Sequence, residues 1–242
     1  MRIWQRFYRG GTPEYLAKHY WWAYIWRLGV WFFDHQPIIS SILFGQYQAL
    51  LDATQQVIGN PIHGKMLQIA CVYGKLTPTI AQNLADDELH IIDVATVQLN
   101  ATRHKLNNGS ASKNNYFLVK MNAEYLAFAN NSFDTALIFF LLHEMPYAAR
   151  QRTLTEALRV LNKNGRLIIT EYGELTATHA FHRIGFIRYL LGILEPFLPE
   201  FWQQSLNSVV KDCAHQVDKT VSVRKETMVF NRFYRVIEYT VI

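Results

Sequence analysis

From residue 65 onward, short apolar segments alternate with segments of helical periodicity. The apolar segments contain few polar residues, as is typical of parallel strands that are buried on both faces. They predict strands at residues 65–72, 90–94, 115–120, 133–141 and 165–172, with helices between them at 76–85, 97–106 and 147–161. This alternation indicates an α/β fold with a doubly wound sheet, and such sheets bind ligands at the carboxyl ends of their strands.

The last predicted elements have boundary signals of their own. Apolar residues recur at helical spacing from Leu154 to Leu161, and the following Asn164 and Gly165 predict a left-handed cap that ends this helix. Residues 222–242 alternate around Asn231, which predicts a terminal β-hairpin. The expected sheet is therefore mostly parallel, with a C-terminal antiparallel hairpin strand.

The length of 242 residues suffices for one α/β domain with a full core and an added helical part. We expect residues 1–60 to form a helical cap at a membrane interface. Residues 61–242 would form the domain, with a helical insertion at about 176–206. The chain contains 6 Trp, 13 Tyr and 15 Phe. That aromatic content predicts an apolar ligand, a membrane interface or a large core.

The charge distribution narrows the class of partner. The net charge is +5 without blocks of Lys or Arg, which argues against a nucleic-acid groove and favours peripheral contact with an anionic membrane. No apolar run reaches the roughly 18 residues needed to span a bilayer, and we expect residues 1–11 to lie at the interface. The two cysteines, Cys71 and Cys213, do not indicate a disulfide framework. The oligomeric state is left open.

Two helical segments are expected outside the core of the fold. Residues 178–197 place apolar side chains at steps of three and four, from Phe181 to Leu194, and predict an amphipathic helix. It is interpreted either as a core-packing helix or as a lid over an apolar substrate that lies on the membrane. Residues 13–26 are dense in Trp and Tyr, and His19 and the phenols there can donate, accept or bind a metal.

Four features beyond the strand order resemble the class I S-adenosylmethionine (SAM) methyltransferases. Asp93 ends the second strand, where that family has an acid for the ribose hydroxyls, and Asn122-Ala123 stands where Asp-Ala lies near the adenine. Residues 130–146 and 156–171 resemble the fourth and fifth strands of the family. The resemblance implies SAM as cofactor. The implied binding residues are Gln68, Ala70, Cys71, Val72, Tyr73, Gly74, Asp93, Val94, Asn122 and Ala123.

The loop after the first strand, MLQIACVYGKLT, departs from the pattern of that family. Ala70 and Val72 replace two glycines whose missing Cβ lets the backbone approach the methionyl end of SAM, and Gln68 replaces an acid. One interpretation is that cofactor binding is lost. The other is that only the methionyl end has been rebuilt, with Tyr73 and Gln68 orienting the amine of SAM, because the positions for ribose and adenine remain suitable.

A narrower resemblance covers nearly the whole chain. The segments YLAKHYWWAY, LQIACVYGKLTP, LLHEMP, LEPF and VRKET resemble the RquA family of rhodoquinone-biosynthesis proteins. This resemblance implies an enzyme that replaces a ring methoxy group of ubiquinone with an amino group. It further implies SAM as the amino donor and a divalent metal, Mn²⁺. The protein would lie peripherally at the cytoplasmic face of the bacterial inner membrane, or at the matrix side of the mitochondrial inner membrane.

The candidate catalytic groups gather after the predicted strands. His143 and Glu144 follow the fourth strand, and this pair suits either acid–base chemistry or a borderline metal such as manganese. The alternative is that His143 packs under the next helix and Glu144 favours its positive N-terminus. The expected catalytic residues are His143, Glu144, Tyr20 and Tyr73, and the expected metal ligands are His143, Glu144 and Glu171, with Tyr172, His19 and Tyr20 behind them.

Two other functions remain open on the sequence. A conventional SAM-dependent methyltransferase acting on a quinone or phenol would produce S-adenosylhomocysteine and need no metal. A non-catalytic subunit with this fold, acting as a scaffold in quinone biosynthesis, would not bind the nucleoside.

Overall fold

The computed structural model describes residues 11–85, 87–108, 115–175 and 179–242. The interfacial segment expected at residues 1–11 lies outside this range except for Gly11. The expected insertion begins at Thr176, which is also outside the described residues.

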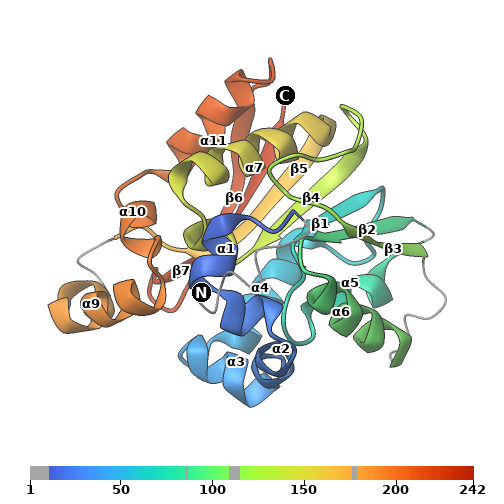
Figure 1. Cartoon of the computed structure of the whole chain (residues 1–242). Helices are drawn as coiled ribbons and strands as arrows, with labels where there is room; N and C mark the ends of the chain where they lie inside the picture. Colours follow the sequence, from blue (N-terminus) through green and yellow to red (C-terminus); the bar gives the residue numbers. More distant parts are fainter. Residues whose placement is uncertain (1–10, 86, 109–114, 176–178) are drawn as a thin grey trace.

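Seven strands form one sheet in the order β3-β2-β1-β4-β5-β7-β6 (Figure 1). Strands β1 to β5 pair in parallel, and β7 pairs antiparallel with both β5 and β6. The predicted mostly parallel doubly wound sheet with a C-terminal antiparallel hairpin is thus confirmed. The strands are β1 Met66–Ile69, β2 Glu88–Asp93, β3 Asn115–Lys120, β4 Phe133–Phe139, β5 Leu161–Tyr172, β6 Val221–Val229 and β7 Tyr234–Val241.

The helices fall into three groups along the chain. Those before β1 are α1 Glu14–His19, the π-helix η2 Trp21–Ile25, α2 Arg27–Phe33, α3 Gln36–Ile42 and α4 Tyr47–Ile58. Those between the parallel strands are α5 Leu76–Asn83, α6 Thr96–Asn108, the 3₁₀ turn η4 Leu142–Glu144 and α7 Tyr147–Val160. Those between β5 and β6 are α8 Ala180–Arg183, α9 Gly185–Leu194, α10 Leu198–Trp202 and α11 Leu206–His215.

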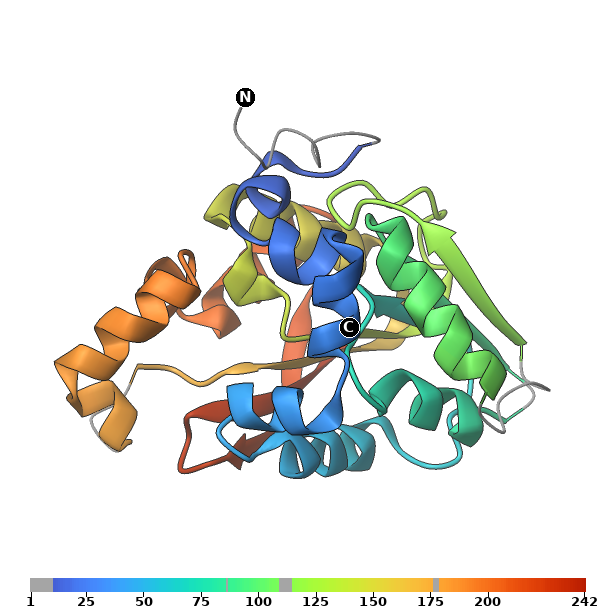
Figure 2. The ribbon, with the colours of Figure 1, turned by 60° about the horizontal axis from the view of Figure 1, so that its bottom comes forward.

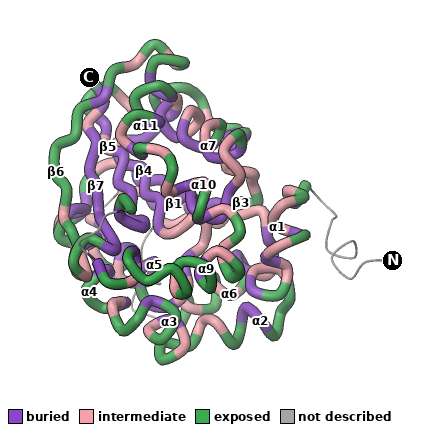
Figure 3. The backbone as a smooth tube through the Cα atoms, turned by 90° about the vertical axis from the view of Figure 1, so that its left-hand side faces the viewer, coloured by how far each residue is buried: buried purple, intermediate pink, exposed green. Residues whose placement is uncertain are grey.

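Burial explains the strand patterns. Every residue of β1 is buried, whereas β6 is exposed along most of its length at one edge of the sheet (Figure 3). Helix α4 packs against β5, β6 and β7, while α7 packs against β5 and α11. Figure 2 shows α4 and α7 on opposite faces of the sheet. Strands covered on both faces need apolar side chains on both faces, which is why the central strands lack an alternating pattern.

Two sequence-based expectations about helix ends were wrong. Helix α7 ends at Val160, and its cap Leu161 is extended, with φ −75° and ψ 139°, because this buried residue already pairs with Phe133 of β4. Asn164 does have a left-handed φ of 64°, but it lies within β5, where the register against β4 shifts. The single helix expected over residues 178–197 is divided into α8 and α9 by the extended Ile184.

The helices before β1 hold the loop that follows β1. The amide of Gly74 donates to Asp34 Oδ1 at 2.8 Å, and the same oxygen accepts from Lys105 Nζ at 2.7 Å. The amide of Lys75 donates to the phenol oxygen of Tyr47 at 2.7 Å. Gly74 has a φ of 75°, and a Cβ there would lie 2.3 Å from that phenol oxygen. Glycine is therefore required at position 74 both for its conformation and for the approach of Tyr47.

Alanine substitutions at Gly74 and Gly45 should distinguish the need for a left-handed conformation from the need for space beside Tyr47. Gly45 has nearly the same φ, 78°, and a Cβ added there would meet nothing within 4 Å. We expect Gly45→Ala to lower the free energy of unfolding by about 1 kcal/mol through the left-handed conformation alone. Gly74→Ala should lower it by about 3 kcal/mol, because overpacking against Tyr47 adds to the strain. Urea unfolding measures both, and equal losses would contradict the role given to Tyr47.

Candidate active site

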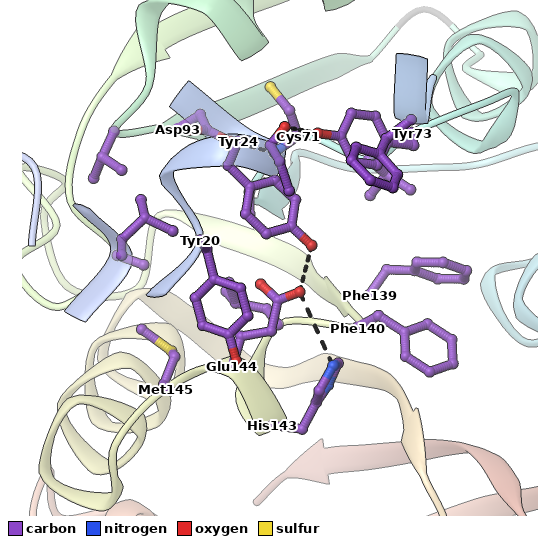
Figure 4. A pocket seen from close by; sticks show the side chains of 18 of the residues that line it. Tyr20, Tyr24, Cys71, Tyr73, Asp93, Phe139, Phe140, His143, Glu144 and Met145 are labelled. Carbon is purple, nitrogen blue, oxygen red and sulfur yellow. Dashed lines mark hydrogen bonds and ion pairs between the residues drawn. The ribbon is translucent and has the colours of Figure 1, made fainter. Parts of the chain in front are cut away.

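A cavity of about 460 Å³ lies at the carboxyl ends of the central strands, next to the N-terminal helices. Its polar groups gather at two ends, with Asp93 and Cys71 toward one and His143 and Glu144 toward the other (Figure 4). The sequence-predicted residues that line it are Tyr20, Ala70, Cys71, Val72, Tyr73, Asp93, Val94, Asn122, Ala123, His143, Glu144 and Tyr172. Gln68, Gly74, Glu171 and His19 are not among the lining residues.

At the first end, Asp93 joins the ends of β1 and β2. Its carboxylate accepts from the amide of Cys71 at 2.9 Å and from the amide of Ala95 at 2.7 Å. Burial raises the pKa of Asp93 to about 6, although these amide hydrogen bonds act in the opposite direction. Nearby, Asn122 accepts from the amide of Glu124 at 3.0 Å, which fixes the orientation of its side chain. Both side chains line the cavity with polar atoms suited to a nucleoside.

The loop after β1 keeps a glycine-like turn without the glycine. Ala70 has a φ of 73°, in the left-handed region that glycine adopts without strain. The side-chain amide nitrogen Nε2 of Gln68 donates to the backbone carbonyl of Ala70 at 3.0 Å and to Thr77 Oγ1 at 2.9 Å. Gln68 therefore holds the turn from behind the cavity, and the expectation that it orients a ligand amine is not supported by its position. Burial raises the pKa of the Cys71 thiol well above its usual value, so this thiol stays protonated.

Tyr73 lines the cavity and also fastens the N-terminal helices to this loop. Its hydroxyl donates to the carbonyl of Ala23 and accepts from the amide of Gln98 at 2.9 Å. Its ring stacks on Tyr24 with centroids 5.7 Å apart and planes inclined by 12°. The phenol of Tyr73 is thus held by its own chain, and burial raises its pKa above the usual value.

At the second end, η4 presents His143 and Glu144 to the cavity, and Glu195 joins them from the C-terminal end of α9. His143 Nε2 lies 4.0 Å from Glu144 Oε1 and 3.9 Å from Glu195 Oε2. One ligand atom from each of the three residues lies within 4.8 Å of the others. An imidazole nitrogen and two carboxylate oxygens at this spacing suit a divalent cation or a shared-proton site.

Glu171 stands behind His143 and orients it. Its Oε1 accepts from His143 Nδ1 at 2.7 Å and from the amide of Tyr172 at 2.8 Å, while its Oε2 accepts from the amides of Leu142 and His143 at 3.0 and 3.3 Å. Because a carboxylate only accepts, Nδ1 carries the proton and Nε2 faces the acids. Glu171, one of the three expected metal ligands, is therefore not in the group of potential ligand atoms, which contains Glu195 instead, and its carboxylate takes the position of a group that orients the imidazole.

Two tyrosines complete the polar end. The hydroxyl of Tyr24 donates to Glu144 Oε1 (Figure 4). The hydroxyl of Tyr20 donates to Glu195 Oε2 at 3.0 Å. Burial and the carboxyl group of Glu195 raise the pKa of Glu144 to about 8. Burial lowers the pKa of His143, but the charge and hydrogen bond of Glu171, together with Glu195 and Glu144, raise it overall to about 9. The cluster therefore consists of two buried groups, His143 and Glu144, and the partly buried Glu195, and the pKa of each is raised by burial or by neighbouring carboxyl groups.

The sequence analysis missed Tyr24 and Glu195 as site residues. Tyr24 was one of several aromatic residues in the segment 13–26, and nothing in the spacing distinguished it. Glu195 had a usable signal, because it is the only acid between Glu174 and Glu200 in the sequence and follows a largely apolar helix. An isolated acid after such a helix lies at its C-terminus, where the dipole does not favour it.

Comparisons with known proteins agree with this architecture. Residues 66–165 match a family model described as a methyltransferase domain. Among solved structures, the PH0226 protein of Pyrococcus horikoshii superposes with a TM-score of 0.56 and 14% identity, and the matched region spans 95% of this chain and 99% of that protein. The [4+2]-cyclase SpnF covers 79% of this chain and 80% of its own, with a TM-score of 0.57 and 17% identity. The chain has the class I methyltransferase fold.

The curated relatives include quinone enzymes. The ubiquinone/menaquinone biosynthesis C-methyltransferase UbiE of Pseudoalteromonas translucida is 32% identical over 111 residues, which is 45% of this chain and 43% of the relative. The chain thus matches less than half of the length of that relative. SpnF, named as a cyclase, has the same fold, so the fold by itself does not determine the reaction.

The left-handed turn at Ala70 can be tested by stability. Ala70→Gly should raise the free energy of unfolding by about 1 kcal/mol, because glycine relieves the strain of φ 73°. Ala101→Gly, within α6, should lower it by about 1 kcal/mol through helix propensity. Urea denaturation of the two variants gives the comparison. A loss of stability in both would mean that Ala70 does not occupy a glycine-like turn.

Proposed function

We propose that this protein is a SAM-using transferase that replaces a ring methoxy group of ubiquinone with an amino group, with a divalent metal, manganese, at its polar end. The observation that carries the proposal is the convergence of His143, Glu144 and Glu195 on the same cavity that Asp93 and Asn122 line. Methyl transfer to a quinone does not require a metal-type cluster of this kind. The resemblance to the RquA family, described above, accounts for both ends of the cavity.

SAM would lie along the first end. Asp93 would accept from the ribose hydroxyls, and Asn122 and Ala123 would lie against the adenine, since all three line the cavity. The turn at Ala70 fits the group, because its left-handed backbone lets residues 70–72 line the cavity as a glycine turn would. The match of residues 66–165 to a methyltransferase domain supports SAM as the cofactor.

The metal would be held by His143 Nε2 and by the carboxylates of Glu144 and Glu195. Nitrogen and oxygen donors within 4.8 Å of one another fit a borderline divalent ion, and Glu171 fixes the imidazole for it. When bound, such an ion supplies Lewis acidity that draws electron density from a quinone carbonyl.

Tyr20 and Tyr24 would transfer the protons of this reaction. Bond formation between the amine nitrogen and the ring carbon would release one proton, and departure of the methoxy group as methanol would take one up. Release of the amino group from SAM would also break the bond between this nitrogen and the α-carbon: the quinone ring would accept the α-hydrogen and two electrons as it becomes a hydroquinone, and water would hydrolyse the resulting imine to the aminohydroquinone and a 2-oxo acid. Tyr20 and Tyr24 each donate to a carboxylate of the cluster, so proton exchange along these hydrogen bonds can serve both needs. The apolar lining around them, which includes Phe139 and Phe140, would keep bulk water from the reacting ring.

The quinone substrate is supported by the curated relatives, which are named as ubiquinone/menaquinone C-methyltransferases. Ubiquinone is a membrane lipid, and we therefore propose peripheral membrane contact at the cytoplasmic face of the bacterial inner membrane, or at the matrix side in a mitochondrion. Among the described residues, no helix has the length and apolar character needed to cross a bilayer.

A conventional methyltransferase acting on a quinone or phenol is the second candidate. The observation in its favour is the set of UbiE relatives together with the methyltransferase-domain match. The two candidates predict different products: an aminoquinone in one case, and a methylated quinone with S-adenosylhomocysteine in the other.

Isotope labelling of SAM distinguishes them. Purified protein is incubated with ubiquinone in detergent, Mn²⁺ and SAM that carries a heavy isotope of nitrogen in its amino group. We expect an aminoquinone that contains the heavy nitrogen, detected by mass spectrometry. SAM labelled in its methyl carbon is the control and should leave the product unlabelled. A methyl-labelled quinone as the only product would establish the second candidate instead.

Manganese binding can be measured without turnover. Electron paramagnetic resonance of free Mn²⁺ should give an affinity that falls at least tenfold in His143→Ala and in Glu195→Gln, because each removes a ligand. Glu88→Gln, whose partners Lys65 and His90 lie elsewhere on the sheet, is the matched control and should bind as the natural protein does. Unchanged affinity in both site variants would refute the metal site.

A further inference from the structure

Helix α9 is apolar on the side that faces solvent as well as on the side that faces the protein. Its only buried residue is Leu191, and Ile187, one turn earlier, packs partly against the core. The exposed side carries Phe186, Tyr189, Leu190, Ile193 and Leu194, at successive steps of three, one, three and one. A helix that is apolar all round is normally buried in a core or in a membrane. Apart from Arg188 and the hydroxyl of Tyr189, the exposed side chains of α9 are therefore apolar, unlike those of an ordinary solvent-exposed face.

The cavity of the candidate site opens beside this helix. Within the part of the chain that the structure describes, three residues both line the cavity and are exposed: Trp22 at 38%, Ile42 at 48% and Leu194 at 54%. They belong to η2, α3 and α9, so these three elements border the mouth. Exposed lining residues mark the route by which a ligand enters, and here every one of them is apolar. A ligand that enters by this route therefore contacts apolar side chains first at the mouth and then inside the cavity.

The surroundings of the mouth carry aromatic and basic side chains. Trp31 and Phe32 of α2, and Phe44 after α3, are also exposed. Helices α9, α3 and α2 lie along the lower edge of the molecule in Figure 1, and Figure 2 brings this side forward. Arg183 and Arg188 are exposed on or next to α9, and residues 179–194 contain no acid. Exposed aromatics beside basic groups are typical of surfaces that bind an anionic lipid interface.

We infer that the outer stripe of α9 and the rim of Trp22 and Ile42 dock on an anionic lipid bilayer, so that the cavity opens directly into the membrane. A protein seated on this surface would cover the mouth, whereas a bilayer can deliver an apolar ligand through it. No cavity-lining residue except Leu194 belongs to the stripe, so docking leaves the interior of the site unchanged. That the ligand is a quinone rests on the proposed function, as does the membrane contact proposed there, whereas the surface that makes this contact is inferred from the exposed residues of α9, η2 and α3.

Vesicle flotation tests the inference. The natural protein should float with vesicles of phosphatidylcholine and phosphatidylglycerol, and more weakly with phosphatidylcholine alone, because the arginines favour anionic headgroups. The double variant Phe186→Ser/Ile193→Ser should bind the mixed vesicles about tenfold more weakly, since it removes two exposed apolar side chains that do not line the cavity. Val223→Ser/Met228→Ser is the matched control, because both residues are 42% exposed on β6, and it should bind as the natural protein does.

Two further readouts separate the possible failures. Circular dichroism and SAM titration should be unchanged in the α9 variant, which establishes that the variant is folded. Sedimentation velocity without vesicles should show no change in mass between the natural protein and this variant. Equal vesicle binding by all proteins, or a dimer that dissociates in the α9 variant, would overturn the inference. Either result leaves the isotope experiment on the reaction unaffected, so failure of docking and failure of the proposed function are distinguishable.

Discussion

The geometry of the polar end depends on one buried carboxylate, that of Glu171. It sits at the end of β5 and satisfies three backbone amides of the neighbouring segments as well as Nδ1 of His143. Without these acceptors, the turn after β4 would bury unpaired donors at a substantial energetic cost. The same contacts fix the tautomer of His143 and turn Nε2 toward Glu144 and Glu195. One side chain therefore both satisfies the backbone amides at the carboxyl end of the sheet and orients the imidazole of the site.

The other end of the cavity is organised by the segment before β1. Asp34, Tyr47 and Tyr73 make contacts between this segment and the loop after β1. The backbone of this loop is thus held by side chains of the segment before β1, namely those of Asp34 after α2 and Tyr47 of α4. Tyr24 stacks on Tyr73 of this loop and also donates to Glu144, so the two tyrosines connect the loop to the polar end of the cavity. The N-terminal helices thus connect both ends of the site rather than merely covering it.

The sequence determined the sheet more reliably than the site. Buried strands have a strong signature, because residues covered on both faces must be apolar, and the five predicted parallel strands were all found. The cap at Asn164 was misplaced because strand pairing at Leu161 overrides the local preference for a left-handed residue. Ala70 is the opposite case. Its φ of 73° is left-handed because of the turn, but an alanine in the sequence does not predict a left-handed residue. Glu195 reaches His143 only through the placement of α9, which no local pattern encodes.

The two ends of the cavity differ in how closely they follow from the fold. The end with Asp93 and Asn122 lies where β2 and β3 of the parallel sheet end, and sheets of this kind bind ligands at the carboxyl ends of their strands. The end with His143, Glu144 and Glu195 requires η4, the C-terminal end of α9 and the support of Glu171 to coincide. The [4+2]-cyclase SpnF shares the architecture, so the fold by itself does not distinguish one reaction from another, and the second end of the cavity is where this chain adds groups that the sheet does not require. In this protein those groups are the buried His143 and Glu144 and the partly buried Glu195, and the hydroxyls of Tyr24 and Tyr20 donate to their carboxylates, so one imidazole, two carboxyls and two phenols meet at a place that three separate segments have to build together.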